Sequence, residues 1–432
     1  MVCSNITING EHLYFAGQDT VALAEKYGTP LYLMDEDRIR YNCRVYKKAM
    51  DKYFGNGAMA LYAGKAASFA RMYPIIDEEG LGADVVSMGE IATAVRAGFP
   101  MEKAYFHSNN KTDADIEYAI EKGIGYFVAD NVEELKAIER IAGEKGVNQK
   151  VLLRLTPGID PHTYAAVATG KVDSKFGSAI ETGQAEEITK YALSLKNVVL
   201  CGFHCHVGSQ VFDSDVYLRA SDIMLEFIAD IKIKYGFLAR ILDMGGGYGV
   251  RYVESDPVID IDANIKQVAE HMKAKAEMLG ITLPSVRMEP GRSIVADAGM
   301  TLYTVGTIKR ITGYKNYVSI DGGMTDNPRF ALYGSKYTVI AANKANLVCD
   351  FKASVVGRCC ESGDIIQENV MLPDNITRND IIAVLTTGAY NYSMASNYNR
   401  VPRPPIVMLS KENSYVAVRR ETPEDMARLD LL

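Results

Sequence analysis

Short apolar segments alternate with amphipathic segments through the middle of the chain, from about residue 58 to about residue 290. Each unit has a run of mostly apolar residues, a turn, and a stretch with helical spacing, as a buried strand followed by a surface helix would have. Eight segments are expected to be strands: 58–63, 82–85, 104–107, 126–130, 151–155, 200–207, 240–244 and 286–289. Eight such units predict a (β/α)8 barrel of the TIM type. A doubly wound open sheet is the alternative, but its usual Gly-x-Gly-x-x-Gly turn does not follow an early strand.

Helix boundaries within this region carry local signals. Ser87 with Glu90, and Asn131 with Glu134, have the spacing of a capping box, in which side chains satisfy the first free N–H groups of a helix. Gly98 and Gly123 stand where a helix end requires a positive φ.

After Arg292 the pattern changes to short segments rich in β-branched residues, separated by turns. These segments, 301–310, 317–321, 347–357, 380–388, 405–409 and 415–420, predict an all-β domain. Residues 5–15 also have strand character and are followed by a helical pattern at 19–28. We therefore expect a barrel domain at 36–294, and a second, β domain that joins residues 1–35 to 295–432.

Composition limits the class of protein. The 432 residues are 48% hydrophobic with a net charge of −7, which argues against a nucleic-acid binder. Mean hydropathy is −0.06 and no run of eighteen apolar residues occurs, so no membrane span is expected. The seven cysteines are scattered, without a zinc-binding pattern, and the start of the chain does not resemble a signal peptide. A cytoplasmic protein with reduced thiols is expected.

Polar residues gather at the carboxyl ends of the expected strands, where barrel enzymes place their chemistry. They are Lys65, Asp84, His107, Arg154, His204, His206, Ser209, Asp243, the run Gly245–Gly247, Glu289 and Arg292. Lys65 follows a buried strand, and partial desolvation would make its amine a nucleophile for a carbonyl group.

His204 and His206 are two residues apart and should share one face of a strand. Such a pair occurs in metal-dependent barrel hydrolases, but those have further ligands on the first strand, and this chain has none there. Two ordinary core histidines are a third possibility. An imidazole stacked on a flat cofactor ring fits the position better.

The run Gly245–Gly247 allows the backbone to approach a phosphate with its N–H groups, and Gly291 with Arg292 opens a second such loop. Glu289 precedes that loop, and a carboxylate aimed at a ring nitrogen keeps it protonated, as pyridoxal phosphate (PLP) requires. These residues together indicate an aldehyde cofactor with a phosphate tail, bound to Lys65 as a Schiff base.

Six motifs resemble the diaminopimelate decarboxylase family, whose members combine an alanine-racemase-like barrel with a β domain. They are YAGKA at 62–66, HCHVGSQ at 204–210, DMGGGYG at 243–249, MEPGRSIVADAG at 288–299, CCESGD at 359–364 and GAYNYSMASNYN at 388–399. The resemblance covers essentially the whole chain in order. It implies PLP-dependent decarboxylation of meso-2,6-diaminopimelate to L-lysine, the last step of lysine biosynthesis, with no metal.

The resemblance also implies roles for individual residues. PLP would be held by Lys65, His206, Ser209, Gly245, Gly246, Gly247, Glu289, Gly291, Arg292 and Tyr390. The substrate would be contacted by Arg292, Arg329, Tyr333, Glu361 and Tyr390. Cys360 would donate a proton after CO2 leaves. Cys360 and Glu361 would come from the neighbouring subunit of a homodimer.

Three alternatives remain open at this point. An ornithine- or arginine-type decarboxylase would share the barrel but would need an acidic residue where Arg329 stands. A PLP-binding protein without catalytic activity would not need the β domain, and the metal-dependent hydrolase is the third alternative. Finally, residues 162–177 resemble the lid segment of the family at their end, Ser174–Gly177.

Overall fold

The computed structural model describes residues 2–55, 57–159, 174–411 and 413–431. The chain divides into two compact units. The first unit contains Met1–Tyr41, Val250–Pro257 and Arg292–Leu432, and the second contains Asn42–Gly249 and Val258–Gly291.

The second unit is a closed parallel barrel. Its strands follow one another in the order β5, β6, β7, β8, β9, β11, β12, β13, and pairing of β13 with β5 closes the ring. The bounds are β5 Met59–Ala63, β6 Gly82–Val85, β7 Ala104–Phe106, β8 Tyr126–Ala129, β9 Gln149–Thr156, β11 Val198–His204, β12 Ile241–Asp243 and β13 Ser285–Met288. A short strand, β10 (Ser178–Ala179), pairs with the carboxyl end of β9. All eight expected strands are present, and the predicted (β/α)8 barrel is confirmed.

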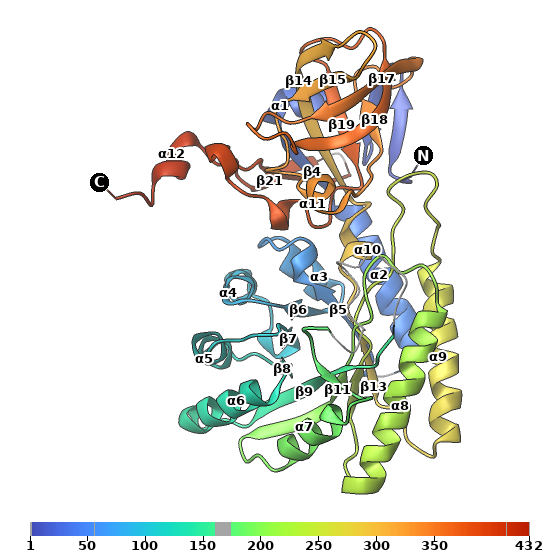
Figure 1. The fold of residues 1–432 in the computed structure, drawn as a ribbon, viewed down its shortest axis with the longest axis vertical. Helices are drawn as coiled ribbons and strands as arrows, with labels where there is room; N and C mark the ends of the chain where they lie inside the picture. Colours follow the sequence, from blue (N-terminus) through green and yellow to red (C-terminus); the bar gives the residue numbers. More distant parts are fainter. Residues whose placement is uncertain (1, 56, 160–173, 412, 432) are drawn as a thin grey trace. The chain divides into compact units, whose positions relative to one another are not determined.

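Helices lie around these strands (Figure 1). They are α3 Met72–Glu78, α4 Met88–Arg96, α5 Asp113–Glu121, α6 Val132–Lys145, α7 Gln184–Leu193, α8 Asp215–Tyr235 and α9 Ile261–Met278. The helix α2 (Glu36–Tyr53) precedes β5. Gly98 and Gly123 both have φ of +75°, as predicted for residues that follow a helix end.

The two predicted capping boxes form with one change. Ser87 Oγ and Asn131 Oδ1 accept the N–H groups of Glu90 and Glu134, as expected. Each glutamate, however, accepts a backbone N–H one residue before the cap: Glu90 from Val86, and Glu134 from Asp130. The carboxylates therefore fasten each strand end to the helix that follows it.

The first unit is built on two sheets. The small one joins β1 Ile6–Asn9, β2 His12–Phe15 and β3 Gln18–Asp19. The large one contains β4 Leu31–Asp35, β14 Gly299–Arg310, β15 Asn316–Ile320, β16 Val339–Ala341, β17 Cys349–Val356, β18 Ile365–Pro373, β19 Ile381–Leu385, β20 Ile406–Ser410 and β21 Asn413–Val418. Helices α1 Thr20–Tyr27, α10 Arg292–Val295, α11 Arg329–Tyr333 and α12 Pro423–Ala427 complete the unit.

The N-terminal residues join the C-terminal ones in this unit, as expected, but in two ways. Strands β1 to β3 form a sheet of their own, whereas β4 lies between β14, antiparallel to it, and β20, parallel to it. Leu31 and Leu33 of β4 pack in one core with Leu13 and Val407. Strands β16 and β18 were not predicted from the sequence.

Two further sequence expectations concern the extent of the described chain. Most of the lid-like segment, residues 162–173, lies outside the described residues, whereas Ser174–Gly177 is described. The compact units assign Val250–Pro257 to the first unit, whereas the sequence places it in the 36–294 domain, and those boundaries remain a prediction. Among the helices of the described residues, none is long and apolar enough to cross a membrane.

Candidate active site at the carboxyl ends of the barrel strands

Backbone hydrogen bonds between neighbouring barrel strands continue one residue beyond the ends of two strands. They fix the backbone positions of the polar residues there. His107 donates its backbone N–H to Val85 O, and Glu289 donates its own to Gly245 O, each at 2.8 Å. Asp84 lies within β6, and His204 and Asp243 end β11 and β12. Because the strands are parallel, these side chains belong to the same end of the barrel, as the sequence predicted.

Lys65 stands in a single 3-10 turn, Gly64–Ala66, directly after β5. Its Nζ lies 3.2 Å from Asp84 Oδ2. The Asp84 side chain is fully buried, whereas that of Lys65 is 41% exposed. The amine is thus tethered to a buried carboxylate and remains accessible from the other side.

Glu289 is surrounded by ionisable side chains from three other strand ends. Its Oε1 lies 2.7 Å from His107 Nε2, and its Oε2 lies 3.4 Å from His204 Nε2. The ligand-type atoms of His107, His204, Asp243 and Glu289 all lie within 4.8 Å of one another, and all four residues are buried. The contact of His107 with Oε1 is close but poorly aligned, so that neither atom has a hydrogen bond of good geometry.

The surroundings divide the charge unequally between the two carboxyl groups. Burial raises the pKa of Asp243 well above its usual range, and the negative charge of Glu289 raises it further. Burial also opposes ionisation of Glu289, but the imidazoles of His107 and His204 outweigh it and hold the pKa of Glu289 well below its usual range. Burial lowers the pKa of His204 to about 4. The surroundings therefore favour ionisation of Glu289 over ionisation of Asp243.

His206 does not join this cluster. Strand β11 ends at His204, and the Nδ1 atom of His206 accepts the N–H of Gly246 at 3.2 Å. Burial lowers the pKa of His206 well below its usual value, and the nearby charge of Lys65 adds to this, so the ring is neutral. His204 and His206 therefore do not converge on one point, as the alternative of a metal-binding histidine pair would require.

The glycine run serves mainly as close-packed backbone. A Cβ on Gly246 would lie 2.1 Å from Glu289 O, and one on Gly247 would lie 2.4 Å from Gly208 O. The N–H of Gly245 donates to Asp243 Oδ1 and that of Gly246 to His206 Nδ1. The expectation that all three N–H groups would be free is thus wrong for Gly245 and Gly246, because neighbouring buried acceptors engage them.

Two other predicted cofactor residues lie on two further loops of the same unit. Ser209 is half-buried on the loop after β11. Gly291 is buried, and a Cβ there would lie 2.9 Å from Ala63 Cβ, so the loop after β13 packs directly against the end of β5. The predicted phosphate-binding loop after β13 therefore packs against the strand that leads to Lys65.

Within the first unit, both arginines that are predicted to bind substrate lie close to one aromatic ring. The guanidinium groups of Arg292 and Arg329 lie 4.8 and 5.4 Å from the ring centroid of Tyr390. Arg329 also lies 5.5 Å from the ring of Tyr333, and its Nε is buried without a hydrogen-bond partner. Tyr390 adopts a φ of +64°, a strained conformation of the kind found at functional sites.

Cys360 and Glu361 lie in the turn between β17 and β18. Both are exposed on the chain. The N–H of Cys360 donates to Asn399 Oδ1 at 2.8 Å, and Glu361 Oε1 accepts the N–H of Gly363 at 3.1 Å. No contact with the two arginines is found for either side chain in the described part of the chain.

The buried groups fit a pyridine cofactor that carries an aldehyde. Glu289 Oε1 is a buried, ionised oxygen without a hydrogen-bond partner, which a protonated ring nitrogen would satisfy. Lys65, which is paired with Asp84, offers an amine at the same end of the barrel. The same four-residue cluster has metal-ligand side chains, but an ionised carboxylate next to an amine also meets the needs of PLP.

Comparison with known proteins agrees with this chemistry. Residues 36–296 match the family model of the pyridoxal-dependent decarboxylases, pyridoxal binding domain. Diaminopimelate decarboxylase of Bacillus subtilis is 43% identical over 420 residues, covering 97% of this chain and 95% of the relative. The chain belongs to the diaminopimelate decarboxylase family. It is accordingly a carboxy-lyase with PLP as cofactor.

Two further relatives extend the comparison. Diaminopimelate decarboxylase of Bacillus methanolicus is 44% identical over 410 residues, covering 95% of this chain and 94% of the relative. The crystal structure of diaminopimelate decarboxylase from M. jannaschii in complex with L-lysine superposes with a TM-score of 0.92 at 32% identity, covering 100% of this chain and 99% of the other. The family resemblance predicted from the six motifs is confirmed.

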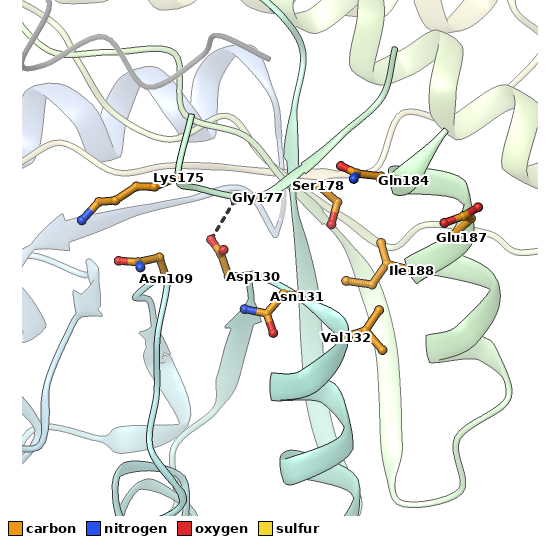
Figure 2. A pocket seen from close by; sticks show the side chains of 10 residues that line it. All are labelled: Asn109, Asp130, Asn131, Val132, Lys175, Gly177, Ser178, Gln184, Glu187 and Ile188. Atoms are coloured by element: carbon orange, nitrogen blue, oxygen red, sulfur yellow. Dashed lines mark hydrogen bonds between the residues drawn. The ribbon is translucent and has the colours of Figure 1, made fainter. Parts of the chain in front are cut away.

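A separate cavity of about 420 Å³ lies at the edge of the same barrel end. It is lined by Asn109, Asp130, Asn131 and residues from 175 to 188 (Figure 2). Asp130 Oδ1 accepts the N–H of Gly177, which fastens the segment after the lid-like residues to the end of β8. None of the residues predicted to bind cofactor or substrate lines this cavity.

Three residues of the site carried no predicted role: Asp84, His107 and Asp243. All three stand at strand ends that the sequence identified, but a sequence does not show which neighbouring side chains meet. The signal available was their residue type, since ionisable side chains at such buried positions require a partner.

Proposed function

We propose that this chain converts meso-2,6-diaminopimelate to L-lysine and CO2, the last step of lysine biosynthesis. The observation that carries the proposal is the presence, at one end of the barrel of this family, of Lys65, whose side chain is partly exposed, and of Glu289, which is buried and favours its ionised form. When bound, PLP supplies a ring that takes up the electron pair left by the departing CO2.

Different loops would hold the different parts of the cofactor. Lys65 would hold it covalently, Glu289 would keep its ring nitrogen protonated, and His206, neutral and half-buried, would lie against the ring. Its phosphate would lie among the loops that contain Ser209, Gly245–Gly247 and Gly291–Arg292. Tyr390 would complete the cofactor site.

Arg329 is the proposed partner of the substrate's second carboxylate. A bidentate arginine is a natural partner of a carboxylate, and the Nε of Arg329 is buried and unpaired without one. An amine at the same place would leave that positive charge unmatched, which disfavours ornithine-type substrates. Arg292 and Tyr333 would also contact the substrate, and Glu361 would bind its distal ammonium group.

We propose Cys360 as the proton donor after CO2 has left, with Cys360 and Glu361 supplied by the partner subunit of a homodimer. Their exposure on the chain supports this role in an interface. The domain at 36–294 would bind the cofactor, and residues 1–35 with 295–432 would complete the site. No disulfide joins the cysteines of the described residues, in agreement with the expected location in the cytoplasm.

The deciding experiment assays the purified protein with meso-diaminopimelate, ornithine, arginine and lysine side by side. The expected result is CO2 and L-lysine from the first substrate and little product from the others. Yellow protein that borohydride bleaches supports the Lys65 attachment. Colourless protein with bound zinc and no decarboxylation would overturn the proposal.

A further inference from the structure

His107 is the side chain that connects the two charged ends of the site. Its Nε2 lies 2.7 Å from Glu289 Oε1 and 3.8 Å from Asp84 Oδ1. The other oxygen of Asp84 contacts Lys65 Nζ at 3.2 Å. A continuous line of ionisable groups thus runs from the amine, through Asp84 and His107, to Glu289.

The position of His107 is rigidly defined. The residue is 4% exposed, and its backbone N–H extends the ladder to Val85 O. Its ring lies edge-on to that of His204, with centroids 4.9 Å apart and planes at 67°. Backbone pairing on one side and ring packing on the other leave the imidazole little freedom to turn away from Glu289.

His107 and His204 make different contacts with the carboxylate. His107 Nε2 approaches Oε1, the oxygen with no hydrogen-bond partner, whereas His204 approaches Oε2 at a longer 3.4 Å. Without a nearby N–H group, the carboxylates of Asp84, Asp243 and Glu289 would repel one another in a buried setting and take up protons. Other charged groups that act on this cluster are Arg154 and Arg287.

We propose that His107 is a positioning residue that keeps Glu289 ionised and aimed at the ring nitrogen of the cofactor, and couples it to the Asp84–Lys65 pair. This inference rests on the proposed function, because it assumes PLP at the barrel mouth. Burial disfavours ionisation of Asp243, which leaves the negative charge on Glu289. His107 itself need not touch substrate.

The test compares three variants of the PLP-loaded enzyme. His107→Leu removes the N–H group, and His107→Gln restores an N–H donor at about the distance of Nε2. His271→Leu is the matched control, since His271 lies on α9 and pairs with Asp222 at 2.8 Å, away from the strand ends. The direct readout is the ¹⁵N NMR signal of the ring nitrogen of ¹⁵N-labelled PLP, which reports protonation independently of turnover.

In His107→Leu the ring-nitrogen signal should move towards the unprotonated position, and kcat should fall about tenfold or more with a smaller change in KM. His107→Gln should recover most of both properties, and His271→Leu should match wild type. A wild-type ¹⁵N signal in His107→Leu would overturn the proposal, as would equal defects in the leucine and glutamine variants.

If His107→Leu does not fold, His107→Asn takes its place, because the shorter amide cannot reach Glu289 as glutamine can. A difference in the ¹⁵N signal between the glutamine and asparagine variants supports the proposal, and identical signals overturn it. Failure here leaves wild-type decarboxylation intact. Failure of the proposed function would instead appear as wild-type protein without PLP or without activity.

Discussion

Lys65 and Asp84 form an ion pair whose two members differ in exposure: the carboxylate is fully buried and the lysine side chain is 41% exposed, with Nζ 3.2 Å from Oδ2. A buried charge requires a partner, so Asp84 holds the amine at the barrel mouth. The lysine side chain nevertheless stays in contact with solvent, from which a carbonyl compound would approach. This asymmetry explains how one lysine can be both fixed in place and reactive.

The first prediction concerns this lysine. Lys65→Ala should abolish the visible absorption of bound PLP and reduce decarboxylation to background, because no other amine of the site is assigned to the cofactor. Absorption spectra and CO2 release measure the two effects. Lys136→Ala, at an exposed position on α6, is the control and should behave as wild type. Normal turnover by Lys65→Ala would rule out the cofactor assignment.

The second prediction concerns substrate choice. Arg329→Ala should lower kcat/KM for diaminopimelate about ten- to a hundredfold, since it removes a charge-assisted contact of about 1.5–3 kcal/mol. PLP content should be unchanged. Arg310→Ala is a suitable control, because Arg310 pairs with Asp374 on an exposed edge of the first unit. Unchanged kinetics in Arg329→Ala would mean that substrate choice lies elsewhere.

The third prediction concerns the shared site. Lys65→Ala and a double variant, Cys360→Ala with Glu361→Ala, should each be inactive as homodimers. After mixing and subunit exchange, half of the dimers pair the two variants, and each of these has one intact site. The mixture should regain about a quarter of wild-type activity. With exchange demonstrated by mass spectrometry, activity that stays at the level of the single variants would show that each site is built within one chain.

The fourth prediction concerns pH and stability. Burial raises the pKa of Glu90 to about 7, and its Oε2 accepts the N–H of Val86 at 2.8 Å. The folded protein therefore holds a proton that the unfolded chain releases above about pH 4.5, so wild-type stability should fall as pH rises from about 4.5 to about 7.

Glu90→Gln keeps the acceptor oxygen but cannot ionise. Its stability relative to wild type should therefore increase across that window, by about 3 kcal/mol in total if the whole shift is realised. Thermal denaturation of both holoenzymes between about pH 5 and pH 8 measures the difference. Two curves that remain parallel would contradict the assignment of the raised pKa to Glu90.

Most of the barrel could be predicted because its signals are local. The strand at 82–85 and the helix that starts after Ser87 are each defined by a few adjacent residues, and the structure confirms both. Strand β18 escaped prediction because Ile365–Pro373 mixes polar and apolar residues, and Asn369 interrupts it with a φ of +56°. The pairing of β15 with β17, parallel and non-consecutive, has no signature in sequence.

The same limit applies to the site. Lys65 and Glu289 could be identified because each stands in a motif whose residue types suit one cofactor. The contact of His107 with Glu289 spans two strands that are far apart in the chain, and only the closed barrel brings them together. Likewise, the engagement of the Gly246 N–H by His206 depends on the path of two loops, which composition does not reveal.

The position of β4 has a consequence for biosynthesis. Met34 of this strand pairs with Gly299 on β14, and with Met408 on β20, near the end of the chain. A ribosome therefore releases β4 long before its partners exist, while the barrel strands, made next, find their neighbours in order as they emerge. One edge of β4 must wait for β14, Gly299–Arg310, and the other for β20, Ile406–Ser410. A chain truncated before β20 should keep the barrel but leave the second edge open to association with other nascent chains.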